Sequence, residues 1–402
     1  MRTWDAWKRL LEGRPLPAAV IDLDALEHNA AVLLEALRPG LSLRLASKSI
    51  RVPALFRHLS ERGGGRIVGL MTYSAHETAW LAEQGFDDLL LGYPVGRADE
   101  AAAVAAAARR ATVRAAVDDV AQARLLSAAA QGAGSTVRVC LDIDVSWRPF
   151  GGLAHLGVRR SPIRAPREAV ALARACRAMP GLEVDSVLAY EAQVAGLSDA
   201  AGASPADRAA AAVRQFVKRR SIPLAARRRG NVVRALRTDG VELRVVNGGG
   251  SGSIRSTSAD PSVTEITAGS GFVASHLFDG YAGLPWRPAL FFALAVVRRS
   301  DPDHVTCAGG GYVASGASGP SRLPRVHAPE GWAPVDLEGF GEVQTPLRAG
   351  PHAPPIALGD PVICRPAKAG ELAERFSHYL LVRGDRVVET VPTYRGLGRC
   401  WP

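Results

Sequence analysis

The sequence predicts an α/β protein in which a (β/α)8 TIM barrel is followed by a second, mostly β C-terminal domain. Up to about residue 285, short β-rich runs alternate with alanine-rich helical stretches, and this alternation occurs eight times. From residue 286 the helical signal almost disappears, and apolar runs are separated by Gly, Pro and Asp turns. We therefore expect a barrel over residues 17–285 and a separate β-domain over residues 286–402.

Short apolar runs bounded by turn residues are the expected barrel strands. They are residues 41–46, 66–71, 88–93, 112–117, 137–143, 184–190, 243–247 and 263–267. Segments of helical composition, such as "SAHETAWLAEQG", separate most of them. The stretch 196–240 has low complexity, and we expect a loop followed by a polar helix there.

Composition argues against several classes of protein. The net charge of +10 suggests a nucleic-acid partner, but basic runs such as 218–221 and 226–231 carry no interleaved aromatic residues, which favours a compositional bias. Five cysteines form no CxxC pair, and we expect them to be small buried side chains rather than a disulfide framework. The longest apolar run, 289–297, is too short to span a bilayer, and the N-terminus has no apolar signal region. We expect a cytoplasmic protein without nucleic-acid or membrane partners.

Lys48 is notable because only four of the 49 Lys and Arg residues are lysines. Arginine takes nearly every other basic position, so this lysine is a candidate for chemistry that a guanidinium cannot perform, namely losing a proton and attacking a carbonyl. Side chains alternate across a strand, which would turn Leu43 and Leu45 outward and Arg44 and Lys48 into the barrel. Lys48 would then lie at the C-terminal mouth, where barrel enzymes carry their chemistry. A solvated lysine just past a strand end is the alternative.

Two glycine-rich segments, "NGGGSGS" (247–253) and "AGSG" (268–271), follow the last two expected strands. Glycine lets backbone N–H groups approach an anion, and the loops after barrel strands seven and eight commonly bind phosphate. A lysine and a phosphate site at one barrel mouth indicate pyridoxal phosphate. A nucleotide-binding dehydrogenase is disfavoured, because the loop lacks the G-x-G-x-x-G spacing and lies far from the first strand.

Further motifs occur in order along the chain. They are "PAAVIDLDALEHNA" (17–30), "RLASKS" (44–49), "LDIDVSWR" (141–148), "AYEAQVAG" (189–196), "VTEITAGSG" (263–271), "GGGYVASG" (309–316), "GEVQTP" (341–346), "AKAGELAERF" (367–376) and "TVPTYRG" (390–396). With them the chain resembles the alanine racemase-like, fold-type III pyridoxal-phosphate enzymes. The most similar branch is that of D-threonine aldolase, D-serine dehydratase and the bacterial amino acid deaminase/aldolase proteins. The resemblance implies that a leader, residues 1–16, joins the β-domain, that this domain closes the active site, and that the protein is a homodimer.

The resemblance also implies roles for individual residues. Lys48 would form the Schiff base with the cofactor, and Tyr190 and Gln193 would meet the cofactor's ring oxygen or the substrate. A tyrosine half in the core is the alternative for Tyr190. The expected cofactor-binding residues besides Lys48 are Arg44, Arg148, Asn247, Gly248, Gly249, Gly250, Ser251, Gly252, Gly269 and Ser270. We expect Arg138 and Asp142 to serve barrel packing.

Relatives of the D-threonine aldolase and D-serine dehydratase type carry a metal on a His-x-Asp or His-x-Cys pair in the β-domain. In this chain Pro366 and Lys368 stand at those two positions. Proline has no side-chain donor and an ammonium repels a divalent cation, so we expect no metal there. Lys368, with Glu371 as its partner, would act on the substrate's hydroxyl or carboxylate instead. A lysine on a solvated turn is the alternative.

The expected substrate is a small amino acid. By resemblance we expect a lyase that cleaves or forms the Cα–Cβ bond of a β-hydroxy, D-configured amino acid by an aldol step. β-Elimination, as in a dehydratase or deaminase, is one alternative, and racemisation or epimerisation is another. A protein that binds pyridoxal phosphate without turnover is the alternative from a different class.

Overall fold

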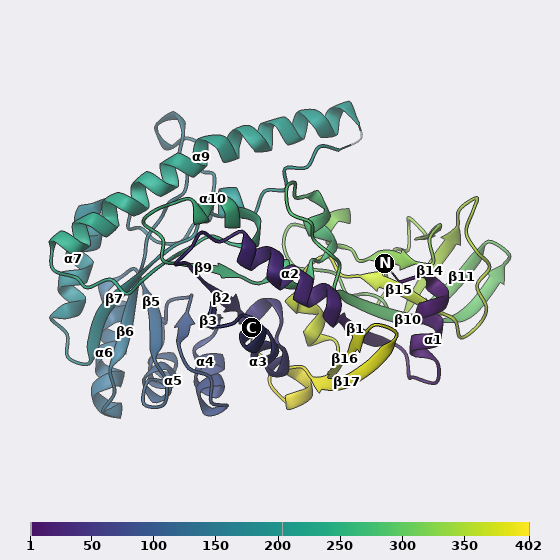
Figure 1. Ribbon diagram of the computed structural model, residues 1–402, viewed down its shortest axis with the longest axis horizontal. Coiled ribbons are helices and arrows are strands. Elements are labelled where there is room, and N and C mark those ends of the chain that lie inside the picture. The colour runs from purple at the N-terminus through teal and green to yellow at the C-terminus, as the bar shows by residue number, and fades with distance from the viewer. Residues whose placement is uncertain (1, 203, 402) are drawn as a thin grey trace. The chain divides into compact units, whose positions relative to one another are not determined.

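The computed structural model describes residues 2–202 and 204–401 (Figure 1). Its internal contacts divide the chain into two compact units. The barrel unit consists of Leu33–Lys48, His58–Gly269 and Trp401. The β unit consists of the residues up to Val32, together with Ser49–Arg57 and Ser270–Cys400. The division falls inside two helices, α2 (Leu23–Glu35) and α3 (Pro53–Arg62).

Eight parallel strands close the barrel in chain order. They are β2 (Ser42–Ala46), β3 (Ile67–Thr72), β4 (Leu89–Leu91), β5 (Val113–Val117), β6 (Val137–Asp142), β7 (Leu182–Ala189), β8 (Val245–Gly248) and β9 (Glu265–Ala268). Strand β9 pairs with β2 from Ser42↔Glu265 to Leu45↔Ala268, which completes the ring. The predicted barrel is therefore confirmed.

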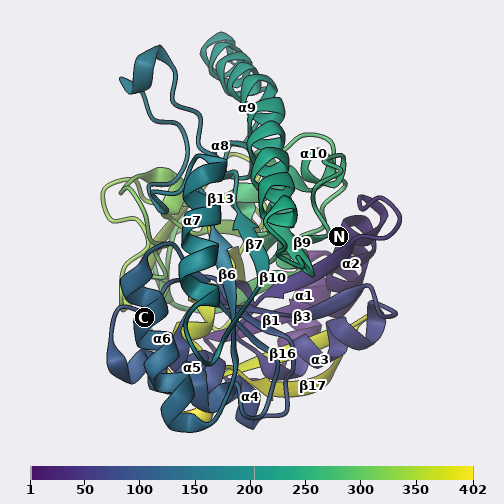
Figure 2. The same cartoon turned by 90° about the vertical axis from the view of Figure 1, so that its left-hand side faces the viewer.

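Helices of the barrel unit follow the strands. They are α4 (Ala75–Glu83), α5 (Ala98–Ala107), α6 (Val120–Ala133), α7 (Pro166–Arg177), α8 (Ala192–Ala195), α9 (Pro205–Thr238) and α10 (Ile254–Ser258). Helices α4, α5 and α6 pack side by side outside the strands (Figure 1). The long helix α9 confirms the polar helix predicted in 196–240; Ser204 caps its N-terminus and Asp207 completes the capping box. Figure 2 shows α9 extending along the same face of the barrel unit as α7.

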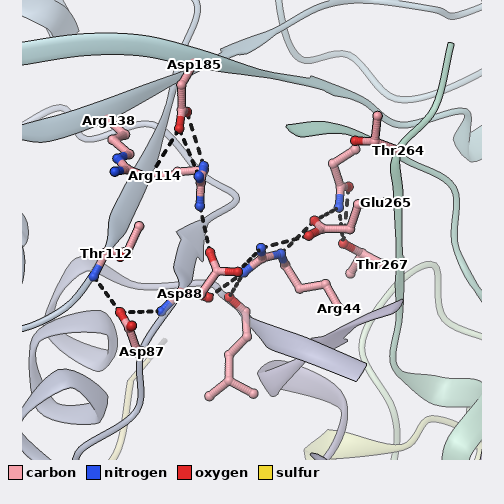
Figure 3. Close-up of polar contacts among 12 residues, drawn as sticks. Arg44, Asp87, Asp88, Thr112, Arg114, Arg138, Asp185, Thr264, Glu265 and Thr267 are labelled. Carbon is pink, nitrogen blue, oxygen red and sulfur yellow. Dashed lines mark hydrogen bonds and ion pairs between the residues drawn. The ribbon is translucent and has the colours of Figure 1, made fainter. Parts of the chain in front are cut away.

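The barrel interior contains buried charges (Figure 3). The fully buried guanidinium of Arg44 donates to Glu265 at 2.7 and 2.8 Å and to Asp88 at 2.9 Å. Arg114 links Asp88, at 2.6 Å, to Asp185, at 2.8 Å. Since a lone buried charge is costly, each guanidinium is paired with carboxylates. Further along the strands Leu90, Cys140 and Leu188 form an apolar layer.

The β unit contains one nine-stranded sheet, which confirms the predicted β-domain. Its strands are β1 (Ala18–Asp22), β10 (Leu290–Asp301), β11 (His304–Ala308), β12 (Arg325–Ala328), β13 (Trp332–Pro334), β14 (Gln344–Ala349), β15 (Pro361–Arg365), β16 (His378–Arg383) and β17 (Arg386–Pro392). Strand β1, which the sequence patterns did not predict, lies between β10 and β16. Helix α1 (Trp4–Leu11) packs Trp7 and Leu11 into the core of this unit. In the described part of the chain, no helix is both long and apolar enough to cross a membrane.

Candidate active site at the barrel mouth

Lys48 lies directly beyond the C-terminal end of β2. The strand ends at Ala46, close to the predicted end, and Ser47–Ser49 forms a turn of 3-10 helix, so the alternation of side chains along the strand does not reach Lys48. Its position at the mouth does not depend on that alternation, because parallel strands all end at the same rim. The exposed Lys48 donates from Nζ to the hydroxyl of Tyr93 at 2.9 Å. Tyr93 follows β4 at the same rim.

Arg160 joins this lysine to a second tyrosine. Its guanidinium lies 5.2 Å from the ring centre of Tyr93 and 5.3 Å from that of Tyr190. Tyr190 directly follows β7, and Arg160 belongs to the segment between β6 and α7. We call Lys48, Tyr93, Arg160 and Tyr190 the mouth cluster. Sequence analysis identified Lys48 and Tyr190 and missed the other two.

The two tyrosines of the mouth cluster have opposite tendencies to ionise. Burial raises the pKa of Tyr190, so this phenol keeps its proton and can donate it in a hydrogen bond. Burial also disfavours ionisation of Tyr93, but the adjacent cations Lys48 and Arg160 outweigh burial and lower the pKa of Tyr93. Arg160 thus lies between a phenol that can donate a hydrogen bond, Tyr190, and one that accepts a hydrogen bond from Lys48, Tyr93. Paired groups with divergent pKa values are typical of acid–base sites.

Asp142 adds a carboxyl group to the same end of the barrel. It is the last residue of β6 and only 3% exposed. Burial raises its pKa to about 7, even though the positive charge of Arg160 acts in the opposite direction. We expected Asp142 to serve packing; its environment instead allows it to hold a proton near neutral pH.

The glycine-rich loop after β8 is partly held by the protein itself. The Gly249 amide donates to Glu191 at 3.1 Å, and the Gly250 amide donates to the Ser253 hydroxyl at 3.1 Å. A Cβ on Gly248 would meet the Arg229 guanidinium at 3.0 Å, so this glycine faces α9. A Cβ on Gly250 would lie 3.4 Å from the Tyr190 ring, so Gly250 is the glycine that faces the mouth cluster.

The two glycine-rich loops lie next to each other. The Gly269 amide donates to the Ser251 hydroxyl at 3.4 Å, at the end of the paired strands β8 and β9. The hydroxyl of Ser49, the residue after Lys48, lies 3.4 Å from the hydroxyl of Ser270, a predicted cofactor-binding residue. Small residues with backbone and hydroxyl donors therefore lie close to the end of β2, directly before Lys48.

Glu191 determines the shape of the first loop, and sequence analysis missed it. Its carboxylate accepts hydrogen bonds from the Gly249 amide, from the Ser253 hydroxyl at 3.2 Å and from the Thr257 hydroxyl. Arg229 of α9 donates to it at 2.7 Å and also pairs with Asp260. In the sequence, Glu191 is visible only as the glutamate after Tyr190 in the motif 189–196. A single glutamate after a strand is too common to predict that it binds a loop.

Several expected cofactor-binding residues have other partners in the structure. Arg44 belongs to the interior charge network, and Asn247 donates to Glu265 at 2.6 Å within it. Arg148 donates to Asp144 at 2.5 Å, and Arg160 takes the place beside the tyrosines. Gln193 is 4% exposed and donates to the Val145 carbonyl at 2.8 Å. In this structure these four side chains donate to groups of the protein itself, and their expected roles toward the cofactor and the substrate stay predictions.

In the β unit the predicted pair of Lys368 and Glu371 is joined by Ser315. The Lys368 ammonium lies 2.8 Å from the Ser315 hydroxyl and 3.4 Å from the Glu371 carboxylate. Glu371 also accepts from the Ser315 amide at 2.6 Å. Burial opposes ionisation of Glu371, but the donors of Ser315 and the charge of Lys368 prevail and lower its pKa. At Pro366 only the backbone carbonyl accepts a bond, from the His276 amide at 3.1 Å.

Comparison with known proteins agrees with the observed fold. The family model described as alanine racemase, N-terminal domain, matches residues 21–270. D-threonine aldolase from Filomicrobium marinum is similar in structure, with 24% identity, 95% of each chain covered and a TM-score of 0.77. D-threo-3-hydroxyaspartate dehydratase from Delftia sp. HT23 has 20% identity, covers 98% of this chain and 100% of its own, and gives a TM-score of 0.73.

An alanine racemase from Clostridium difficile 630 has 15% identity, covers 94% of this chain and 98% of its own, and gives a TM-score of 0.64. At these identities the structural likenesses show the fold alone. No curated protein sequence matches the chain.

Proposed function

Because the chain belongs to the family defined by the alanine racemase N-terminal domain, we propose that it is a pyridoxal-phosphate-dependent enzyme that acts on an amino acid. The observation that carries the proposal is the mouth cluster. It combines an exposed lysine amine, 2.9 Å from a phenol, with a guanidinium and a second phenol at the C-terminal rim of the barrel.

The residues of the barrel mouth fit this cofactor. The Lys48 amine would attach to its aldehyde carbon, and Arg160 and Tyr190 would face its ring. Backbone and hydroxyl donors of 250–252 and of Gly269 and Ser270 would bind its phosphate. The absence of a side chain at Gly250 supports this assignment, because a Cβ there would come within 3.2 Å of Ala195 and would narrow the space beside Tyr190.

When bound, the cofactor would supply an electron sink for charge that develops at the substrate's Cα. The protein's contribution is to hold and move protons around that atom. Tyr190 retains its proton and could donate a hydrogen bond, and Arg160 beside it would compensate negative charge at the cofactor's ring. Lys48, once the substrate amine has displaced it, is available to carry a proton at the same place.

The reaction that we propose is aldol cleavage or formation at Cα–Cβ of a β-hydroxy amino acid, with D configuration. Two similar structures are named for β-hydroxy D-amino acid substrates, an aldolase and a dehydratase, and this supports the substrate class. Dehydration is the second candidate, because it begins on the same substrates. In the β unit, Lys368 would supply positive charge to the substrate's hydroxyl or carboxylate.

Borohydride labelling tests the cofactor assignment. Protein loaded with pyridoxal phosphate should absorb in the visible, and reduction should fix the cofactor to the peptide that contains Lys48. The other three lysines each lie near a carboxylate: Lys8 2.9 Å from Asp360, Lys218 2.9 Å from Asp199 and Lys368 3.4 Å from Glu371. The label should vanish in Lys48→Ala and remain in the control Lys8→Ala. Labelling of another peptide in the wild-type protein would refute the assignment.

Product analysis separates the reactions. With a panel of β-hydroxy D-amino acids, release of glycine and an aldehyde supports the aldolase, whereas ammonia and a 2-oxo acid indicate the dehydratase. Inversion of Cα without cleavage indicates a racemase. A loaded protein that turns over none of these amino acids, and whose visible spectrum none of them changes, would be a carrier of the cofactor.

A further inference from the structure

We propose that Tyr93 is the proton acceptor that converts Lys48 into a nucleophile, and that Arg160, whose guanidinium lies against the Tyr93 ring, is the positioning residue that keeps Tyr93 beside Lys48. This inference rests on the proposed function and adds a catalytic residue to it. Tyr93 touches the reacting atom itself, because its hydroxyl lies 2.9 Å from Lys48 Nζ.

The identity of the partner distinguishes Lys48 from the other lysines. A carboxylate, with an ordinary pKa of about 4, holds a neighbouring ammonium in its protonated form near neutral pH. Lys8, Lys218 and Lys368 all lie within 3.4 Å of carboxylates. A phenol has an ordinary pKa of about 10, far above that of a carboxylate. Tyr93 is therefore a stronger base toward the Lys48 ammonium than a carboxylate would be.

The surrounding charges favour the ionised phenol. Arg160 lies 5.2 Å from the Tyr93 ring and Lys48 Nζ lies 5.5 Å from it, so two cations face one hydroxyl group. Two other titratable groups interact with Arg160: Tyr190, whose ring lies 5.3 Å from its guanidinium, and Asp142, which experiences its charge. Tyr190 stays neutral because burial raises its pKa, so it does not compete for the cations. The lowered pKa of Tyr93 agrees with this arrangement.

The proton balance is simple. The proposed transfer begins with Lys48 as an ammonium and Tyr93 as a phenolate. Transfer of one proton from Nζ to the phenolate oxygen gives a neutral amine and a neutral phenol, and the amine's lone pair can then attack a carbonyl carbon. When the amine leaves again, the same proton returns from Tyr93 to Nζ. Burial opposes ionisation of Tyr93, but Lys48 and Arg160 outweigh it and lower the pKa of Tyr93, so the phenolate forms at a lower pH than for an ordinary tyrosine.

Two readouts other than turnover test the inference. The first is the near-ultraviolet absorbance of tyrosinate as pH is raised. One tyrosine of the wild-type protein should titrate below the others, and this component should disappear in Tyr93→Phe. It should move to higher pH in Arg160→Met, and also in the wild-type protein once Lys48 has been blocked by cofactor and borohydride. The last measurement needs no variant.

The second readout is the rate at which the apo protein gains visible absorbance with pyridoxal phosphate. A general base typically contributes about 100-fold, so Tyr93→Phe should load roughly 100-fold more slowly near neutral pH. The matched control is Tyr379→Phe, because the Tyr379 hydroxyl, in β16, is buried and has no hydrogen-bond partner among the described residues. Equal loading rates for the two variants, or a tyrosinate titration unchanged by Lys48 blockage, would overturn the inference. Failure of wild-type protein to take the label on Lys48 would instead overturn the proposed function.

Discussion

Asp142 shows how a single residue's place in the barrel changes its chemistry. As the last residue of β6 it is almost completely buried, and the hydrogen bond from Ser161, at 2.6 Å, goes to its backbone carbonyl. Burial disfavours the charged carboxylate and raises the pKa to about 7 from its ordinary 3.8. An aspartate at the end of a strand is common, and only its burial makes this one a candidate acid near neutral pH.

The raised pKa of Asp142 predicts a specific pH dependence of stability. Between about pH 4 and about pH 7 the folded protein holds a proton that the unfolded chain has already lost. Raising the pH through this window therefore lowers the free energy of unfolding, by up to roughly 4 kcal/mol for this group. In Asp142→Asn this contribution should be absent, so the variant should lose less stability than wild type between pH 4 and pH 7 in denaturant unfolding.

A control for the Asp142 experiment is Asp385→Asn, since Asp385 lies exposed in the turn between β16 and β17. Its pH profile should parallel that of wild type. If the Asp142→Asn profile is also parallel, Asp142 is ionised throughout and does not act as an acid at neutral pH.

At the scale of secondary-structure elements, α9 secures the first glycine-rich loop. Its Arg229, 1% exposed, donates to Glu191 at 2.7 Å and to the Ala189 carbonyl at 3.0 Å, and it pairs with Asp260. Glu191 in turn accepts the Gly249 amide. Gly249 has a φ of +74°, a conformation that favours glycine, and this hydrogen bond helps to hold it. Helix α9 therefore contributes to the site indirectly: Arg229 holds Glu191, and Glu191 holds the glycine-rich loop.

Two ion pairs offer a matched comparison, that of Arg229 in α9 and that of Arg174 in α7 with Asp239, the C-cap residue of α9. Replacing Arg229 by Met leaves Glu191 and Asp260 buried without their cation, and breaking a buried pair in this way costs roughly 3–5 kcal/mol. We expect a corresponding loss in denaturant unfolding and weaker cofactor binding in a spectroscopic titration. Arg174→Met removes a pair with Asp239 whose arginine side chain is 69% exposed, and it should leave both quantities almost unchanged. Equal effects of the two substitutions would contradict the role assigned to Arg229.

At the scale of the whole molecule, each of the two units contains candidate residues of its own. The mouth cluster belongs to the barrel unit, whereas Lys368, Ser315 and Glu371 belong to the β unit. The Lys368 ammonium donates to the Ser315 hydroxyl and lies beside the Glu371 carboxylate. These acceptor groups hold the lysine's own positive charge in place. We propose that this ammonium supplies the positive charge that a metal would otherwise bring to the substrate.

The proposal for Lys368 predicts turnover without a metal. Activity should survive thorough chelation, and Lys368→Ala should lose about 100-fold in turnover, as for the removal of one donor to a developing negative charge. The variant should still bind the cofactor, and Lys8→Ala should retain full activity. If chelators abolish turnover and zinc or manganese restores it, the assignment of positions 366 and 368 is wrong and His352 or His378 become the candidate ligands.

The sequence by itself determined the order and the approximate bounds of the eight barrel strands, the polar helix α9 and the separate β-rich region. These features follow from the alternation of apolar and polar residues over a few positions, which is a local property of the chain. It also singled out Lys48 and two glycine-rich segments, because a rare residue type and a run of glycines are visible without knowing any contact. Strand parity correctly turned Arg44 into the barrel.

Only the tertiary structure decided which groups meet at the rim. Tyr93 is 45 residues from Lys48 along the chain, and Arg160 comes from a loop whose sequence carries no distinguishing pattern. Arg44 and Asn247 share an orientation with mouth residues but lie deeper, where the interior network engages them. The alternation of side chains along a strand predicts which face each residue occupies. How deep a residue lies in the barrel, and which residues it contacts, depends on where β9 closes onto β2 and on how the strands are staggered. That closure brings together residues far apart in sequence, which no local pattern of the chain specifies.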